Sequence, residues 1–155
     1  MEPDALFTLR FTIGREGERP AHFFYEADRG TMGMTDILKK FRGYYHFIKK
    51  QRKHREAWGV HPIRAVLIET TDEARAKKLM ELVNHPLVCG PGNRVGLFWF
   101  TISPLFSDPA QAHSNKGGRG VSLHLGQPST VFTLIWALPD HSLHSLGDVE
   151  NSSQH

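Results

Sequence analysis

The chain has few of the features that mark secreted or membrane proteins. It holds a single cysteine, Cys89, among 155 residues, which excludes an internal disulfide framework and favours a reducing compartment. Its uninterrupted apolar stretches, such as 134–138, are far too short to cross a bilayer. Residues 1–4 include acidic side chains and no apolar run, unlike a signal peptide. We therefore expect a cytoplasmic protein that makes no membrane contact.

Acidic residues are absent from one long stretch, although the whole chain is nearly balanced in charge. There are 19 Lys and Arg residues against 16 Asp and Glu residues, a formal net charge of +3. Between Leu38 and Arg55 there is no acidic residue. A surface of one sign attracts a phosphate backbone through release of counterions, whereas a merely solvated helix face normally mixes charges. The basic residues predicted to contact nucleic acid are Lys39, Arg42, Lys49, Lys50, Arg52, Lys53 and Arg55.

Length and composition are those of one ordinary soluble domain. With 39% hydrophobic and 23% charged residues, a chain of 155 residues can bury a sizeable core. We expect one domain over residues 1–147, with a mobile polar loop near 107–128 and a disordered tail over 148–155.

Hydrophobic periodicity predicts a mixed β-sheet with helices packed on it, an α/β (α+β) fold. Residues 5–13 and 21–28 are predicted to form a hairpin around a Gly-rich turn. A helix is expected from an N-cap at Thr35 to just before Gly59. Thr70 and Glu73 form a capping-box pattern for a second helix that ends near Val83. Further strands are predicted at 63–70, 97–102 and 131–138.

Three acidic residues flank the predicted hairpin. Asp4 precedes the first strand, while Glu26 and Asp28 close the second, so the hairpin brings them to one end of the sheet. Magnesium prefers oxygen ligands and needs only one or two carboxylates beside a substrate phosphate. The backbone carbonyl of Ala27 is a further candidate ligand. From the spacing alone, a turn cap at Asp4 and two side chains that project into solvent are favoured over a metal site.

Lys40 is the basic residue best placed to reach these carboxylates. The apolar stripe of the first helix contains Ile37, Phe41, Tyr44 and Ile48. Lys40 lies about 90° from the centre of that stripe, at the boundary of the core, whereas Lys39 lies almost opposite and faces solvent.

These residues resemble a known family. Pro3-Asp4 before a strand, the block Glu26-x-Asp28-Arg29-Gly30-Thr31, and a helix with Lys40-Phe41-Arg42-x-Tyr44 are similar to the C-terminal part of the replication-relaxation proteins of plasmids and mobile elements. The similarity extends through Trp58-Gly59-Val60, residues 63–70, Glu73, Arg75, residues 97–101 and Ile135-Trp136.

That family resembles in turn the PD-(D/E)xK nuclease superfamily. The resemblance implies a restriction-endonuclease-like core, here expected to lack the usual N-terminal helix. It implies that Asp4 and Glu26 bind Mg²⁺ or Mn²⁺ and that Asp28 assists or orients. Asp28 stands where the superfamily has a lysine, so Lys40 is expected to supply that positive charge. We expect the N-terminal winged-helix portion of the family to be absent and the chain to be a stand-alone or truncated C-terminal domain.

Three functions remain open from the sequence. The first is a metal-dependent nuclease domain that acts on DNA, with Asp4, Glu26, Asp28 and Lys40 at its catalytic site. The second is a non-catalytic DNA-binding or replication-accessory module that keeps the fold without the chemistry. The third is a small interaction protein that packs its aromatic strands in a homodimer.

Overall fold

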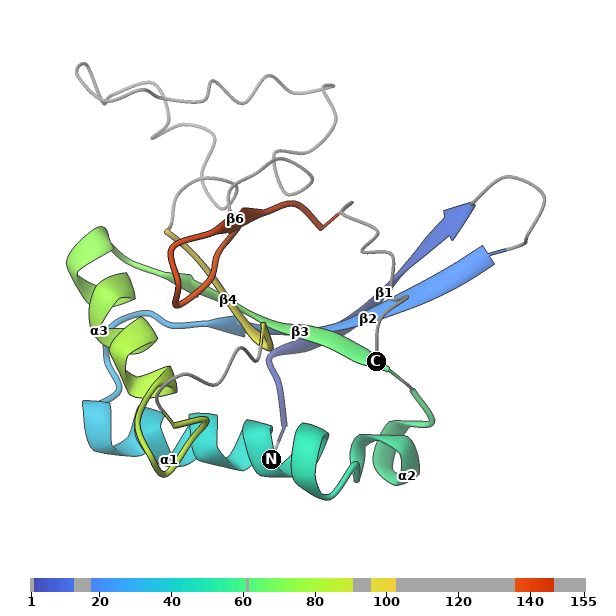
Figure 1. Cartoon of the computed structure of the whole chain (residues 1–155), viewed down its shortest axis with the longest axis horizontal. Coiled ribbons are helices and arrows are strands. Elements are labelled where there is room, and N and C mark those ends of the chain that lie inside the picture. The colour runs from blue at the N-terminus through green and yellow to red at the C-terminus, as the bar shows by residue number, and fades with distance from the viewer. Residues whose placement is uncertain (1, 13–17, 61, 91–95, 103–135, 147–155) are drawn as a thin grey trace, which may run out of the picture.

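The computed structural model describes residues 2–12, 18–60, 62–90, 96–102 and 136–146. These residues form a six-stranded sheet with the spatial order β1-β2-β3-β4-β5-β6 (Figure 1). The predicted mixed sheet with flanking helices is therefore confirmed. The strands are β1 (Ala5–Thr12), β2 (Glu18–Ala27), β3 (Ile63–Thr70), β4 (Phe98–Ile102), β5 (Trp136–Ala137) and β6 (Leu143–His144).

Strand direction brings several chain ends to one edge of the sheet. β1 and β2 pair antiparallel, with Ala5 opposite Tyr25, so the beginning of β1 lies beside the end of β2. β2, β3 and β4 run parallel to one another, so their carboxyl ends share that same edge. Open α/β sheets commonly bind ligands at the carboxyl ends of their strands.

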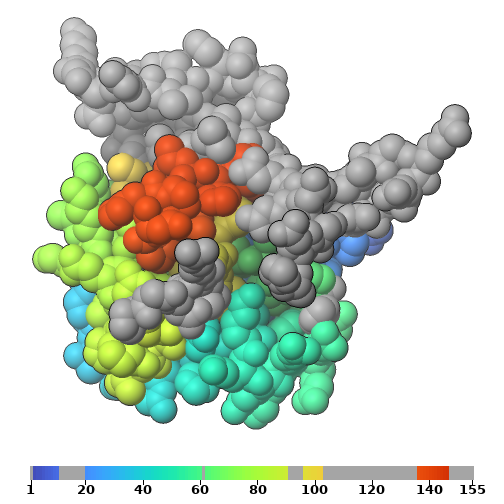
Figure 2. Space-filling view, in the orientation of Figure 1, coloured from blue at the N-terminus to red at the C-terminus, as the bar shows by residue number. Residues whose placement is uncertain are grey.

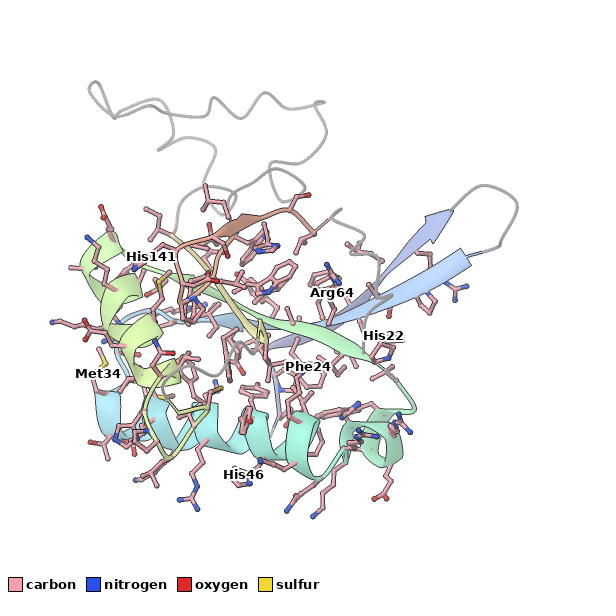
Figure 3. The ribbon with its side chains drawn as sticks, viewed as in Figure 1. His22, Phe24, Met34, His46, Arg64 and His141 are labelled. Carbon is pink, nitrogen blue, oxygen red and sulfur yellow. The ribbon has the colours of Figure 1, made fainter. Side chains whose placement is uncertain are left out.

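The helices cover one face of the sheet (Figure 1). Helix α1 (Met34–Tyr45) connects β2 to β3, and α3 (Glu73–Val83) connects β3 to β4. Phe24 points from β2 toward the helices (Figure 3), where its ring meets those of Tyr44 and Trp58. Because apolar side chains alternate along each strand, every second one enters this core. None of the described helices is both long enough and apolar enough to span a membrane.

The helix predicted from Thr35 to Gly59 is broken into three pieces. After α1 come a π-helical turn, η1 (His46–Lys50), and a short helix, α2 (His54–Trp58). The amide of Gln51 bonds the carbonyl of His46 at 2.7 Å, and Arg52 has a positive φ of 54°. This change of direction lets Trp58 pack edge-on against Phe24 and Phe47. Tertiary packing thus replaces the last turns of the expected helix.

Both predicted N-caps are wrong by two residues. Helix α1 has Gly33 as its N-cap, with an extended backbone and no side-chain cap, and Thr35 already lies within the helix. Helix α3 is capped by Asp72, whose carboxylate accepts a hydrogen bond from the amide of Arg75 at 2.8 Å. Thr70 remains in β3, where its hydroxyl donates to Asp28 instead of capping a helix.

A second apolar cluster covers the opposite face of the sheet. Phe23, Leu67 and Trp99 pack there against Trp136 from the C-terminal segment. That segment lies above the sheet in Figure 1 and against α3 in Figure 2. Of the strand predicted at 131–138, β5 comprises only Trp136–Ala137, and residues 131–135 lie outside the described chain. The loop predicted near 107–128 and the tail at 148–155 also lie outside the described residues.

Candidate functional site at the carboxyl edge of the sheet

Asp4 and Glu26 meet at the edge where β1 begins and β2 ends. Oδ2 of Asp4 accepts a hydrogen bond of 2.8 Å from the backbone amide of Ala27, the residue after Glu26. The negative charge of Asp4 is close enough to contribute to the raised pKa of Glu26. The hairpin therefore brings these two carboxylates together, as the strand pattern predicted.

The carboxylate of Glu26 is buried and accepts two hydrogen bonds from α1. The residue is 5% exposed. Lys40 Nζ donates to Oε2, and the hydroxyl of Tyr44 donates to Oε1. Burial raises the pKa of Glu26, and the hydrogen bonds from Lys40 and Tyr44 only partly offset that rise. Lys40 thus reaches the sheet edge, as its position on the helix predicted.

Tyr44 also belongs to this cluster, although the catalytic site predicted from the sequence did not include it. It follows Lys40 by four residues, so both side chains lie on the same side of α1. Burial and the neighbouring Glu26 carboxylate raise the pKa of the Tyr44 hydroxyl, which therefore stays protonated as a donor. The signal was present in the sequence, because Tyr44 belongs to the same apolar stripe, but an aromatic residue in a stripe usually serves the core alone.

Asp28 engages a different partner and does not join the Asp4–Glu26 cluster. Its carboxylate accepts hydrogen bonds from Arg75 Nε at 2.7 Å, from Arg75 Nη2 at 3.0 Å, and from the Thr70 hydroxyl at 2.8 Å. Burial raises the pKa of Asp28, but the bonds from Arg75 and Thr70 outweigh it and hold the pKa below its usual range. The Asp28 carboxylate, which was predicted to assist at the metal, is therefore engaged in a bidentate ion pair with α3.

Arg75 also fixes the connection between β2 and α1. Its Nη2 atom donates to the carbonyl of Met32 at 2.9 Å, in addition to Asp28. Within the same connection, the amide of Gly30 donates to Asp28 at 3.2 Å, and Gly30 has a φ of 76°, which suits glycine. The connection that leads from Glu26 to Lys40 is therefore held at both of its ends.

Removing the hydroxyl of Tyr44 should raise the pKa of Glu26 further. The Tyr44→Phe variant keeps the ring but loses a donor to the charged carboxylate, and such bonds contribute about 1.5–3 kcal/mol. We expect an upward shift of the Glu26 carboxyl titration, followed by NMR with ¹³C-labelled glutamate. Tyr45→Phe is the matched control, because Tyr45 faces Lys50 rather than Glu26. Equal titration curves in the wild type and Tyr44→Phe would contradict this role for Tyr44.

The donor set at this edge has the chemistry that a hard divalent cation requires. Asp4 and Glu26 provide carboxylate oxygens, and each carboxylate oxygen carries more than one lone pair for sharing. Among the described residues there is no group of three or more His, Cys, Asp or Glu side chains that could hold a metal ion. A divalent ion held here would therefore need ligands from water and a phosphate, which magnesium accepts readily.

The seven basic residues predicted to contact nucleic acid are all exposed. Four of them, Lys39, Arg42, Lys49 and Lys50, fall within about 100° of one another around the helix axis, so they share one broad face. Lys49 lies on the flank away from Lys40, close enough to Cys89 for its charge to lower the pKa of the thiol. Burial of the thiol outweighs this effect and raises its pKa to about 11.

Part of this basic face lies on the outer side of α1. His46 points away from the sheet there (Figure 3). Lys39 and Lys50 occupy the same side by helical spacing. Lys39 forms an exposed ion pair of 2.9 Å with Asp36, and Lys50 lies over the ring of Tyr45 at 5.8 Å. The turn after η1 and helix α2 carry Arg52, Lys53 and Arg55.

Comparison of the chain with family models, with curated proteins and with solved structures found no match.

Proposed function

We propose that this chain is a metal-dependent, nuclease-like domain that hydrolyses phosphodiester bonds in DNA. One observation carries the proposal: at one edge of the sheet, Lys40 from α1 pairs with Glu26, and Asp4 accepts a hydrogen bond from the amide next to Glu26. Two carboxylates can hold a metal ion that activates water, and a lysine can stabilise charge on a phosphate. The resemblance to replication-relaxation proteins suggests a plasmid or mobile element as the source of the DNA.

Each residue of this cluster has a distinct role in the proposed reaction. Asp4 and Glu26 would hold Mg²⁺ or Mn²⁺, which when bound activates water and neutralises charge on the phosphate. Lys40 would orient the attacking water or stabilise charge on the phosphate oxygens. Tyr44 would hold the Glu26 carboxylate in place. Asp28, paired with Arg75, would act at a distance by fixing the connection between Glu26 and Lys40.

The test is cleavage of supercoiled plasmid with Mg²⁺, Mn²⁺ or EDTA. We expect nicked and linear forms with either metal and intact plasmid in EDTA or with Glu26→Ala. Lys40→Met should reduce cleavage about a hundredfold, the usual effect of losing one electrostatic group at a reacting phosphate. Lys77→Met is its matched control, since Lys77 pairs with Glu73 on the exposed side of α3. Cleavage that persists in EDTA would show that the proposed chemistry is wrong.

A second candidate is a DNA-binding or replication-accessory module without cleavage. The observation that favours it is the pairing of both inner carboxylates with the chain's own cations, Glu26 with Lys40 and Asp28 with Arg75. A carboxylate that already has a cationic partner can have a purely structural role, without binding a metal ion. This candidate predicts DNA binding that does not change when Mg²⁺ is replaced by EDTA.

Both candidates predict that DNA affinity falls steeply with salt. Each phosphate contact that is removed should lower the slope of log K against log salt by about 1. We expect the double variant Lys49→Gln/Arg52→Gln to lose about two units of slope, measured by fluorescence anisotropy from about 50 to 200 mM salt. Lys77→Gln/Lys78→Gln removes the same charge from α3 and should leave the slope unchanged. If both double variants had the same slope of log K against log salt, η1 and the turn that follows it would not contact the DNA.

A further inference from the structure

A pocket opens between the end of β2 and helix α1, directly beside Glu26 and Lys40. Its volume is about 130 Å³, enough for several water molecules. Its inner walls are the apolar side chains of Ile37, Phe41, Ile68 and Leu79, none more than 4% exposed. A compact group with apolar faces would fit there.

The rim of this pocket is polar and carries groups suited to a phosphodiester strand. Arg29 and Thr31, both exposed, come from the connection between β2 and α1. Lys40 also lies at the rim, where its charge is shared with Glu26. The rim carboxylates of Glu26 and Asp28 are each paired with a cation, which weakens their repulsion of a phosphate.

We infer that this pocket receives one unpaired nucleobase of the DNA strand whose phosphodiester lies at Glu26 and Lys40. The inference rests on the proposed function and adds a substrate class to it. A nucleobase has two apolar faces for the walls and a polar edge for the rim. Because Glu26 and Lys40 belong to both pocket and cluster, the seated base and the scissile phosphate belong to neighbouring nucleotides.

A seated base has a consequence for which DNA is preferred. Taking a paired base out of a duplex costs a few kcal/mol, whereas an unpaired base costs least. Bulged, branched or single-stranded DNA should therefore be bound in preference to continuous duplex. The apolar walls have no hydrogen-bonding groups that could distinguish one base from another. The preference should therefore be for DNA with an unpaired base, whichever base that is.

The experiment compares three duplexes of one sequence by fluorescence anisotropy in EDTA, so that no strand is cut. One has a single bulged nucleotide, one has an abasic residue as its bulge, and one is fully paired. We expect the bulged base to be bound about tenfold more tightly than the abasic bulge, since contacts to one base commonly contribute that much. Thr31→Trp, which places an indole at the rim, should abolish this difference between the bulged base and the abasic bulge.

Thr35→Trp is the matched control, because Thr35 is exposed and does not line the pocket. It should keep the preference for the bulged base. Equal affinity of the wild-type protein for the bulged base and the abasic bulge would overturn the inference, whatever the folding of the variants. Plasmid cleavage is measured separately, so cleavage with no base preference would overturn only this inference. A preference with no metal-dependent cleavage would overturn only the proposed chemistry.

Discussion

The Glu26→Gln variant should lose metal-dependent cleavage by about a thousandfold or more. The substitution removes the charge of a proposed metal ligand but keeps the size of the side chain. Loss of a ligand removes several kcal/mol of transition-state stabilisation, and each ~1.36 kcal/mol is tenfold in rate. The measurement is the single-turnover rate on plasmid at saturating Mg²⁺.

The fold should tolerate this change, which makes the result interpretable. The carboxylate of Glu26 is buried and its pKa is raised by that burial, so a neutral amide of similar shape relieves a desolvation cost. The amide oxygen of the introduced glutamine side chain can still accept a hydrogen bond from α1. Glu81→Gln, on the exposed side of α3, is the matched control and should cleave like the wild type. If the Glu26→Gln variant cleaved at nearly the wild-type rate, Glu26 would not be a metal ligand.

The Arg75→Met variant should be strongly destabilised. Arg75 and Asp28 are only 15% and 13% exposed. Without the guanidinium, the Asp28 carboxylate remains largely buried with no cationic partner among its described contacts, and the Met32 carbonyl loses a donor. We expect a loss of about 2–4 kcal/mol in the free energy of unfolding, slightly less than for a fully buried pair. Urea denaturation with an unchanged m-value would measure it.

The exposed pair Lys77–Glu73 on the same helix provides the control for Arg75. Its side chains are 61% and 75% exposed, so Lys77→Met should have little effect on stability. If Arg75→Met and Lys77→Met were equally stable, the bidentate pair would contribute nothing to the fold. A double-mutant cycle with Asp28→Asn would then assign the interaction directly.

The stabilisation by Asp28 should also depend on pH in a defined direction. The pKa of Asp28 is lower in the folded protein than in the unfolded chain. Its contribution is therefore fully present above the unfolded pKa of about 3.9 and is lost as the pH falls through the folded value. The difference in stability between the wild type and Arg75→Met should shrink over that acidic range.

Much of the fold follows from local patterns that the sequence displays. Alternation in residues 5–13 and 21–28 predicts the hairpin, and β1 and β2 confirm it. The apolar stripe from Ile37 to Ile48 predicts which side of α1 meets the sheet. These patterns are local because strand and helix periodicities depend only on neighbouring residues. They were enough to place Asp4 beside the end of β2 and to bring Lys40 to Glu26.

Capping and helix continuity were less predictable. A capping box at Thr70 and a continuous helix to Gly59 were both reasonable from propensity, and both are wrong. Thr70 is held in β3 because its hydroxyl bonds Asp28, a residue 42 positions earlier. The helix breaks because the change of direction allows Trp58 to pack against Phe24 in the core. Long-range contacts outweighed local preference at both positions.

By itself, the sequence determined the mixed sheet, the hairpin and the approach of Asp4 and of Lys40 to the end of β2, because each depends on periodicity and chain direction. Only the tertiary structure decided the partners of the remaining polar groups. Asp28 pairs with Arg75 from 47 residues away, and Tyr44 turns its hydroxyl to Glu26. Such pairings depend on where α3 and α1 lie across the sheet, and that placement is set by packing of the whole core rather than by any short segment.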